Sequence, residues 1–181
     1  MKWLFLLCVL ACSAANADEA LWKLVADGGQ VLFIRHAETT PGVGDPQGFK
    51  LEDCTTQRNL SAAGRDQARR MGAEFGRRGI PIGEVLASPW CRCIDTAKLA
   101  FGDSRPWIAL SNLFGRQAEA ERQVRAMRAH VSAYRGKANL MLVSHGSTAA
   151  ALTGEHPAMG EFLVLTPASN GFRLAGRLLV P

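Results

Sequence analysis

An arginine and a histidine stand side by side where a run of apolar residues ends. Val31-Leu32-Phe33-Ile34 are consecutive apolar residues, a pattern typical of a strand that is buried on both faces. Arg35 and His36 follow directly, at the point where this strand must leave the sheet. In an open α/β sheet, ligands bind at the carboxyl ends of the parallel strands. A cationic guanidinium beside an imidazole suits an anion that is also to be attacked, which favours a phosphoryl group.

Two more predicted strand ends carry side chains of the same chemistry. A strand expected over 83–87 is followed by Arg92, in the first turn of the next helix. The apolar segment 139–143 is followed by His145 and Gly146, again at a helix start. Parallel strands bring their carboxyl ends to one edge of a sheet, and helix N-termini add backbone N–H donors there for an oxyanion. Each residue alone would more often be structural, but together they predict a phosphate site.

Strands and helices alternate along the chain, which predicts a single α/β domain. The expected helices cover 19–26, 61–78, 89–101 and 117–134, with another from Ser147, and the expected strands cover 31–34, 83–87, 107–110, 139–143, 162–165 and 171–180. The last two strands should form a β-hairpin. Residues 41–56 lack periodicity and predict a long loop, which in a compact domain is usually functional. The alternation indicates a three-layer α/β/α domain with a mostly parallel sheet.

The first 17 residues have the features of a cleaved secretory signal peptide. Lys2 supplies a positive n-region, residues 3–11 an apolar core, and Ala15-Asn16-Ala17 a small-x-small cleavage site. The apolar stretch is too short to span a bilayer of about 30 Å. Cleavage after Ala17 would leave one domain, residues 18–181, in the periplasm or secreted. A lipoprotein attached at Cys12 is the second alternative, and an uncleaved anchor is the third.

The cysteine count favours one disulfide in that domain. Cys54, Cys91 and Cys93 lie outside the predicted signal peptide, and an odd number in an oxidising compartment suggests one bridge and one free thiol. Cys91 and Cys93 are too close on a predicted helix to pair with each other. A Cys54–Cys91 bridge is therefore predicted, with Cys54–Cys93 as the alternative. No Cys-x-x-Cys pair or compact histidine cluster indicates a metal site.

The charge balance suits a small anionic partner. The chain has a formal net charge of +5 at pH 7, which favours an anionic substrate or an anionic envelope surface. The arginines are spread over several predicted helices, and no basic cluster is interleaved with aromatic residues. This distribution argues against nucleic-acid binding.

The motifs at the strand ends resemble those of the histidine phosphatase superfamily, whose fold is phosphoglycerate-mutase-like. The segments that carry the resemblance are Arg35–Thr39, Ser88–Ala97 and Val143–Gly146, in that order, and Asn59–Ala68 is similar to the segment that opens the first helix of that family. The resemblance covers nearly all of the chain beyond the predicted signal peptide.

The resemblance implies a mechanism through a phosphohistidine. His36 would be the nucleophile, and Arg35 and Arg92 would hold the non-bridging oxygens of the phosphoryl group. His145 would donate to the same group, and water would then hydrolyse the phosphohistidine. The arginines and the second histidine would take the electrostatic role of a cation, so neither a metal nor another cofactor is expected. Arg58 could either pair with a carboxylate or act as a third phosphate ligand.

One residue of the expected pattern is missing. An alkoxide leaving group needs a proton from a general acid, and many members of the family carry a glutamate soon after the third strand. Residues 110–115 contain no acidic residue. Glu38, Glu155 and Glu161 are the candidates, and Glu161, at the start of a predicted strand, is the one we predict. Alternatively the donor is absent, as in relatives that act on phosphoramidates or other good leaving groups.

The sequence thus predicts a metal-independent phosphomonoester hydrolase that acts outside the cytoplasm on a small phosphorylated substrate, for which an envelope sugar phosphate is one candidate. A mutase role fits less well because the chain is short of the insertions that retain a phosphorylated intermediate. A non-catalytic protein that binds phosphorylated ligands through the same pocket is the alternative. A metal-dependent hydrolase ranks third, because acidic ligand clusters are lacking.

Overall fold

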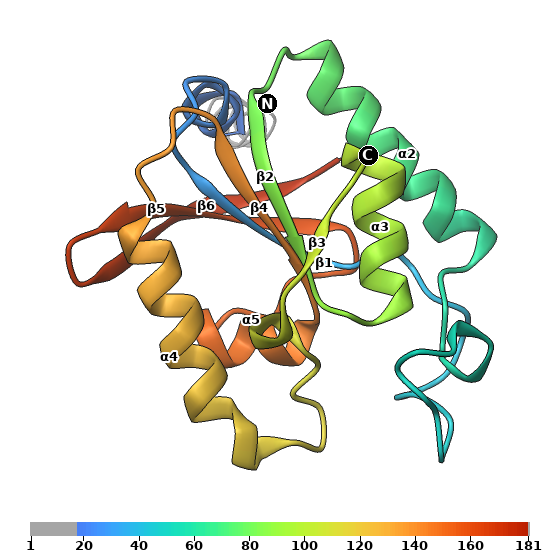
Figure 1. Ribbon diagram of the computed structural model, residues 1–181. Helices are drawn as coiled ribbons and strands as arrows, with labels where there is room; N and C mark the ends of the chain where they lie inside the picture. Colours follow the sequence, from blue (N-terminus) through green and yellow to red (C-terminus); the bar gives the residue numbers. More distant parts are fainter. Residues whose placement is uncertain (1–17, 181) are drawn as a thin grey trace, which may run out of the picture.

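The computed structural model describes residues 18–180, which are built around one six-stranded sheet with the strand order β3-β2-β4-β1-β5-β6 (Figure 1). The predicted signal peptide, residues 1–17, lies outside the described residues. The strands are β1 (Val31–Arg35), β2 (Ile82–Ala87), β3 (Arg105–Pro106), β4 (Asn139–Ser144), β5 (Glu161–Ala168) and β6 (Gly171–Leu179). The helices are α2 (Ala62–Arg77), α3 (Cys91–Phe101), α4 (Gln117–Ala133) and α5 (Gly146–Thr153), with short 3-10 turns η1 (Cys54–Thr56) and η2 (Ile108–Leu110) and a helix over 18–26.

The sheet is mostly parallel, as predicted. β1 and β2 run parallel to the central β4, and β3 runs parallel to β2, whereas β5 is antiparallel to β1, and β6 to β5. The predicted terminal β-hairpin is therefore confirmed, and it extends the parallel part of the sheet by two antiparallel strands. Every residue of β4 is buried, because both faces of the central strands are covered.

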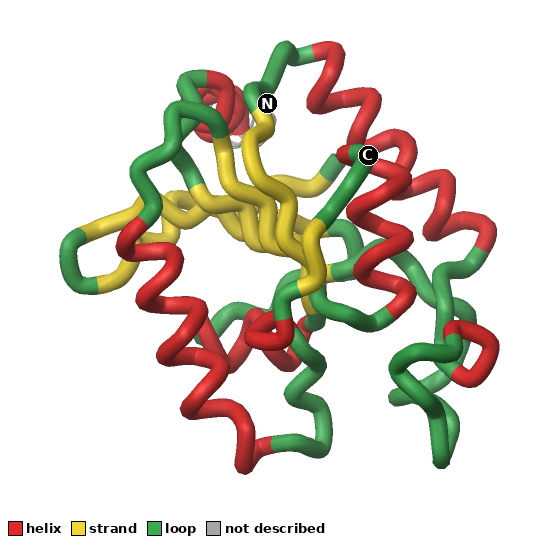
Figure 2. The backbone as a smooth tube through the Cα atoms, viewed as in Figure 1, coloured by secondary structure: helices red, strands yellow, loops and turns green. Residues whose placement is uncertain are grey.

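Helices cover both faces of the sheet, which confirms the three-layer α/β/α architecture (Figure 2). The side chains of β1 alternate between two cores: Leu32 and Ile34 pack with α2, α3 and the helix over 18–26, while Val31 and Phe33 pack with α4, α5 and η2. This alternation is the period of two that a strand imposes on its side chains. Within residues 18–180, none of the helices combines the length and the hydropathy that a membrane span requires.

The helix predicted over 61–78 is confirmed to within a residue at each end. The Ser61 side chain accepts a hydrogen bond from the Gly64 backbone N–H at 2.9 Å and so caps α2. Gly64, Ala68, Met71 and Phe75 form the buried face, at the spacing of three to four residues that a helix requires.

Two predicted elements differ in the structure. The expected strand over 107–110 is wrong: β3 ends at Pro106, and Ile108–Leu110 form η2, where the Leu110 N–H donates back to the Trp107 carbonyl. The helix expected from Pro89 begins at Cys91, because Trp90 has an extended backbone and serves as the N-cap. The later start still leaves Arg92 in the first turn of α3.

Candidate active site

The carboxyl ends of β1, β2 and β4 meet at one edge of the sheet. Arg35 is paired with Ser144 in the β1–β4 register, and the His36 N–H donates to the Ser144 carbonyl at 2.9 Å. The Ser88 N–H, just beyond β2, donates to the Val143 carbonyl at 2.8 Å. These backbone bonds continue the sheet past the strands and fix the residues that follow relative to one another.

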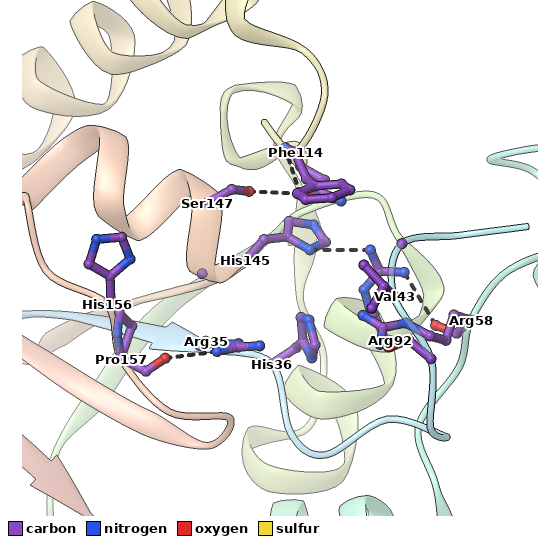
Figure 3. A pocket seen from close by; sticks show the side chains of 14 residues that line it. Arg35, His36, Val43, Arg58, Arg92, Phe114, His145, Ser147, His156 and Pro157 are labelled. Carbon is purple, nitrogen blue, oxygen red and sulfur yellow. Dashed lines mark hydrogen bonds between the residues drawn. The ribbon is translucent and has the colours of Figure 1, made fainter.

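A cavity of about 420 Å³ opens at this edge (Figure 3). It is lined by Arg35, His36, Gly42, Val43, Gly44, Arg58, Arg92, Asn112, Phe114, His145, Gly146, Ser147, His156 and Pro157. Six residues predicted to act on or bind substrate are therefore brought together: Arg35, His36, Arg58, Arg92, His145 and Gly146. The seventh, Glu161, is not among the lining residues.

His36 is buried as a neutral imidazole with one ring nitrogen committed to the backbone. Its Nδ1 lies 2.8 Å from the Ala37 carbonyl oxygen, and since a carbonyl can only accept, Nδ1 carries the proton. Burial lowers the pKa of His36 to about 3, and the charges of Arg92, Arg35 and Arg58 also lower it. Nε2 consequently keeps its lone pair, which is the state that a nucleophilic histidine needs.

Arg35 is held across the N-terminus of α5. Its Nη1 donates to the Pro157 carbonyl at 3.0 Å, and burial lowers its pKa. A Cβ atom at Gly146 would lie only 3.3 Å from Cζ and Nε of Arg35. Glycine at this position therefore lets the guanidinium approach the first turn of α5, where backbone N–H groups lack helical acceptors.

The three arginines of the cavity share an unusual feature. In the described part of the chain, the Nε atoms of Arg35, Arg58 and Arg92 are buried and have no hydrogen-bond partner within the protein. Buried donors are nearly always paired, and the three side chains that carry these unpaired N–H groups all line one cavity. An oxyanion with several oxygens would satisfy them.

Asp45 is a site residue that sequence reasoning missed. Its carboxylate forms an ion pair with Arg92, with 2.6 Å between Oδ1 and Nη1, and the two side chains are 4% and 1% exposed. Burial would raise the pKa of Asp45, but hydrogen bonding to Arg92 and the charge of Arg92 outweigh it and lower this pKa. The long loop over 41–56 was expected to be functional, but nothing in its sequence singled out Asp45.

His145 faces His36 but has both ring nitrogens engaged. The two rings meet edge to face with centroids 5.4 Å apart. Nε2 of His145 lies 2.8 Å from Ser88 Oγ and Nδ1 lies 3.4 Å from Arg92 Nη2. Because Arg92 can only donate, Nδ1 is the unprotonated nitrogen. Burial lowers the pKa of His145 well below its usual value, and the charges of Arg92, Arg35 and Arg58 act in the same direction. The predicted donation to a phosphoryl group therefore requires proton uptake at Nδ1.

The structure does not bring Glu161, the predicted proton donor, to the cavity. Its carboxylate accepts two hydrogen bonds of 2.7 Å from Arg177 and another from the Ala158 N–H, and the Arg177 bonds lower its pKa. It is therefore a paired anion at the start of β5. Glu38 and Glu155, the other candidates, do not line the cavity either.

The mouth of the cavity is formed by residues that the sequence did not single out. Val43 and Phe114 are among the most exposed large apolar side chains of the described residues, at 87% and 61%, and both line the cavity together with His156. The Ser147 hydroxyl donates to Asn112 Oδ1 at 2.8 Å and links α5 to the loop that carries Phe114. An aromatic residue in a loop, such as Phe114, is a sequence signal for a binding surface, whereas nothing in the sequence indicates that His156 lines the cavity.

The cysteines are arranged as predicted. Cys54 and Cys91 form a disulfide, and Gln57 Oε1 accepts a hydrogen bond from the Cys91 N–H at 3.0 Å. Cys93 is free and buried, and burial raises the pKa of its thiol to about 12. Among residues 18–180, no group of three or more His, Cys, Asp or Glu side chains is placed to hold a metal ion.

The depressed pKa of His36 predicts that stability falls in acid. Between pH 6.5 and about 3, the unfolded chain binds a proton at this residue that the native state does not, so the free energy of unfolding decreases as the pH falls through that window. A fully shifted group contributes a slope of about 1.4 kcal/mol per pH unit. Urea unfolding measured between pH 7 and 5 gives the free energy of unfolding as a function of pH, and its slope against pH should be shallower for His36→Asn than for the unsubstituted protein. Equal slopes against pH would contradict a low pKa at His36.

The fold and the site define the class of protein: an α/β domain with a cavity lined by arginines and histidines at the carboxyl edge of its sheet. Residues 31–114 match the family model described as the histidine phosphatase superfamily (branch 1). This match confirms the resemblance predicted from the motifs, and it includes Arg35, His36, Arg58 and Arg92. No curated protein matches the chain at a significant level.

Solved structures share the fold at low sequence identity. The protein histidine phosphatase SixA complexed with tungstate is 18% identical, with a TM-score of 0.53, and the match covers 83% of this chain and 96% of that one. Phosphoserine phosphatase from Entamoeba histolytica in complex with 3-phosphoglyceric acid is 12% identical, with a TM-score of 0.57, over 82% of this chain and 95% of that one. These similarities establish the fold as that of the phosphoglycerate-mutase-like histidine phosphatases.

Proposed function

We propose that the protein is a phosphomonoester hydrolase that works through a phosphohistidine on His36 and needs no metal. The observation that carries this proposal is the buried, neutral His36 beside three arginines whose Nε–H groups have no acceptor in the protein. A phosphoryl group is an anion with several oxygens and an electrophilic centre, so it matches both the donors and the nucleophile.

In the proposed reaction, Nε2 of His36 attacks phosphorus while the bond from phosphorus to the ester oxygen breaks. The leaving oxygen departs with that bonding pair as an anion, which takes up a proton from solvent water. Water then attacks the phosphohistidine and breaks the P–N bond, so inorganic phosphate is released and the imidazole is restored. The guanidinium groups of Arg35, Arg58 and Arg92 offset the charge on the non-bridging oxygens in both steps.

A bound phosphoryl dianion should also recruit His145. The low pKa of this residue is due to burial and neighbouring positive charge. An anion in the cavity offsets that positive charge and so raises the pKa of His145. Protonation at Nδ1, the nitrogen 3.4 Å from Arg92, would give His145 a new donor. Substrate binding is thus expected to be coupled to proton uptake at the residue that the resemblance assigns to phosphoryl binding.

The leaving-group side of the cavity favours substrates with stable leaving groups. The described residues that line it include no carboxylate, the usual general acid for an alkoxide. Phe114 and Val43 instead offer exposed apolar surface at its mouth, to which an aromatic or apolar group can pack. We propose aryl phosphates or similarly activated phosphoesters as the preferred class.

Truncating Phe114 should therefore change substrate selectivity. Phe114→Ala is expected to lower kcat/KM for p-nitrophenyl phosphate about fivefold to tenfold, the size of a lost aromatic contact, and to change that for glycerol phosphate less than twofold. Ile108→Ala is the matched control, because Ile108 is also exposed, at 69%, but does not line the cavity. Equal losses on both substrates would contradict a role for Phe114 in leaving-group binding.

Trapping the covalent intermediate tests the proposed function directly. Acid-labile, base-stable phosphate should appear on the protein when turnover of a labelled phosphomonoester is quenched rapidly, with or without a chelator. Oxyanion binding without turnover of any member of a broad substrate panel would instead favour the non-catalytic binding protein. Activity abolished by the chelator would contradict metal independence.

The proposed location is outside the cytoplasm. The signal-peptide pattern of residues 1–17 and the Cys54–Cys91 disulfide support it, because disulfides persist in oxidising compartments. A phosphorylated component of the cell envelope, such as a sugar phosphate, remains a candidate substrate. A panel that contains both aryl and sugar phosphates distinguishes the two classes.

A further inference from the structure

The Asp45 carboxylate is fully occupied by four donors. Oδ1 accepts from Arg92 Nη1 at 2.6 Å and from the Arg58 N–H at 3.1 Å, while Oδ2 accepts from Arg92 Nη2 at 3.2 Å and from Trp90 Nε1 at 3.0 Å. The side chain is 4% exposed. A carboxylate with this many good hydrogen bonds is held in one geometry, and displacing it would leave several buried donors unpaired.

These contacts determine which edge of the Arg92 guanidinium remains free. Nη1 donates to Asp45 and to the Arg58 carbonyl, and Nη2 to Asp45 and His145. Nε is the guanidinium nitrogen of Arg92 that has no partner within residues 18–180. The guanidinium is planar and rigid, and a bidentate carboxylate holds both of its Nη atoms. The orientation of the Nε–H group is therefore fixed as well.

The loop that carries Asp45 is itself fastened to the start of α3. The Cys54–Cys91 disulfide, the hydrogen bond from the Cys91 N–H to Gln57, and that from Arg92 to the Arg58 carbonyl all join residues 54–58 to the first turn of this helix. Asp45, which precedes this segment in the loop, is joined to the same end of α3 through Arg92 and Trp90. The bonds made by residues 54–58 therefore keep the loop, and Asp45 within it, close to the first turn of α3.

We infer that Asp45 is a positioning residue that aims the Nε–H group of Arg92 at the bound phosphoryl group. This inference rests on the proposed function, because it assigns a purpose to Arg92 within that site. Asp45 neutralises a cation beside the cavity, so its removal has two opposing consequences. The cavity becomes more positive, which favours anions, but Arg92 loses the partner that orients it. Because the carboxylate is fully bonded and buried, we expect loss of orientation to dominate.

If Asp45 positions Arg92, removing its charge should weaken oxyanion binding. If Asp45 were instead an anion that competes with substrate for Arg92, removing its charge should strengthen oxyanion binding. Asp45→Asn keeps the size of the side chain and removes its charge. Tungstate inhibition of p-nitrophenyl phosphate hydrolysis should be weakened at least about tenfold, with KM raised in parallel, and Asp45→Glu should recover part of the loss. Asp53→Asn is the matched control, since Asp53 lies in the same loop but bonds to Thr55 rather than to Arg92.

Loss of folded protein would lower the apparent kcat without changing the inhibition constant, so the tungstate measurement isolates the positioning role. Unchanged or tighter tungstate inhibition in Asp45→Asn would overturn the inference, tighter inhibition being the result for a competing anion. If the unsubstituted protein neither binds tungstate nor forms a phosphohistidine, the proposed function itself fails. If it does both while Asp45→Asn behaves like it, only the role of Asp45 is wrong.

Discussion

Replacement of His36 by alanine is expected to lower kcat for p-nitrophenyl phosphate by on the order of 10⁴-fold or more, the scale seen when a covalent nucleophile is removed. The same variant should accept no acid-labile phosphate. His36 lies just beyond the end of β1, where its backbone N–H donates to the Ser144 carbonyl. The substitution leaves that backbone bond intact, so the loss is one of chemistry.

The folded state of the variant can be checked independently. Alanine cannot be protonated, so the variant lacks the acid destabilisation that comes from the low pKa of His36. Its free energy of unfolding should therefore fall less steeply than that of the unsubstituted protein as the pH drops below 6.5. His130→Ala is the matched control, because His130 packs on Trp107 with ring centroids 4.9 Å apart and does not line the cavity. Full activity of His36→Ala would exclude the phosphohistidine mechanism.

The phosphate-binding half of the cavity could be predicted from sequence because strong local signals carry it. β1 contains the unbroken apolar run 31–34 and β4 the run 140–143, and both runs are buried. Such runs specify both the strands and the place where they end. Since parallel strands end at one edge, Arg35-His36 and His145 had to converge once the strand type was known.

The partners of those residues could not be predicted, because the fold selects them from several equivalent candidates. Arg92 and Asp95 lie three residues apart in α3, yet Asp95 pairs with Arg65 at 3.2 Å and Arg92 pairs with Asp45. Asp45 comes from a loop without periodicity, and no local pattern states where such a loop folds back. Glu161 lies away from the cavity for the same reason: its carboxylate pairs with Arg177, which the β5–β6 hairpin brings to it.

Removal of the Cys54–Cys91 disulfide is expected to lower the free energy of unfolding more than any other substitution proposed for this protein. The two cysteines are 37 residues apart, and closing a loop of this length in the unfolded chain corresponds to about 4 kcal/mol in the chain-entropy model. The double variant Cys54→Ser, Cys91→Ser should therefore unfold at a clearly lower urea concentration, with the slope of the transition little changed. Cys93 is buried and stays in place in this variant.

The site should respond as well, because the bridge fastens the loop that holds Asp45 and Arg58 to the first turn of α3. At temperatures where the double variant is still folded, its KM and its tungstate inhibition constant should rise together, in the direction expected for Asp45→Asn. Reductant should reproduce both effects in the unsubstituted protein and have no effect on the double variant, which lacks the bond. A free energy of unfolding within about 1 kcal/mol of the unsubstituted value, well below the range for native disulfides, would mean that the bridge does not stabilise the fold. An unchanged KM and tungstate inhibition constant would mean that it does not position the site.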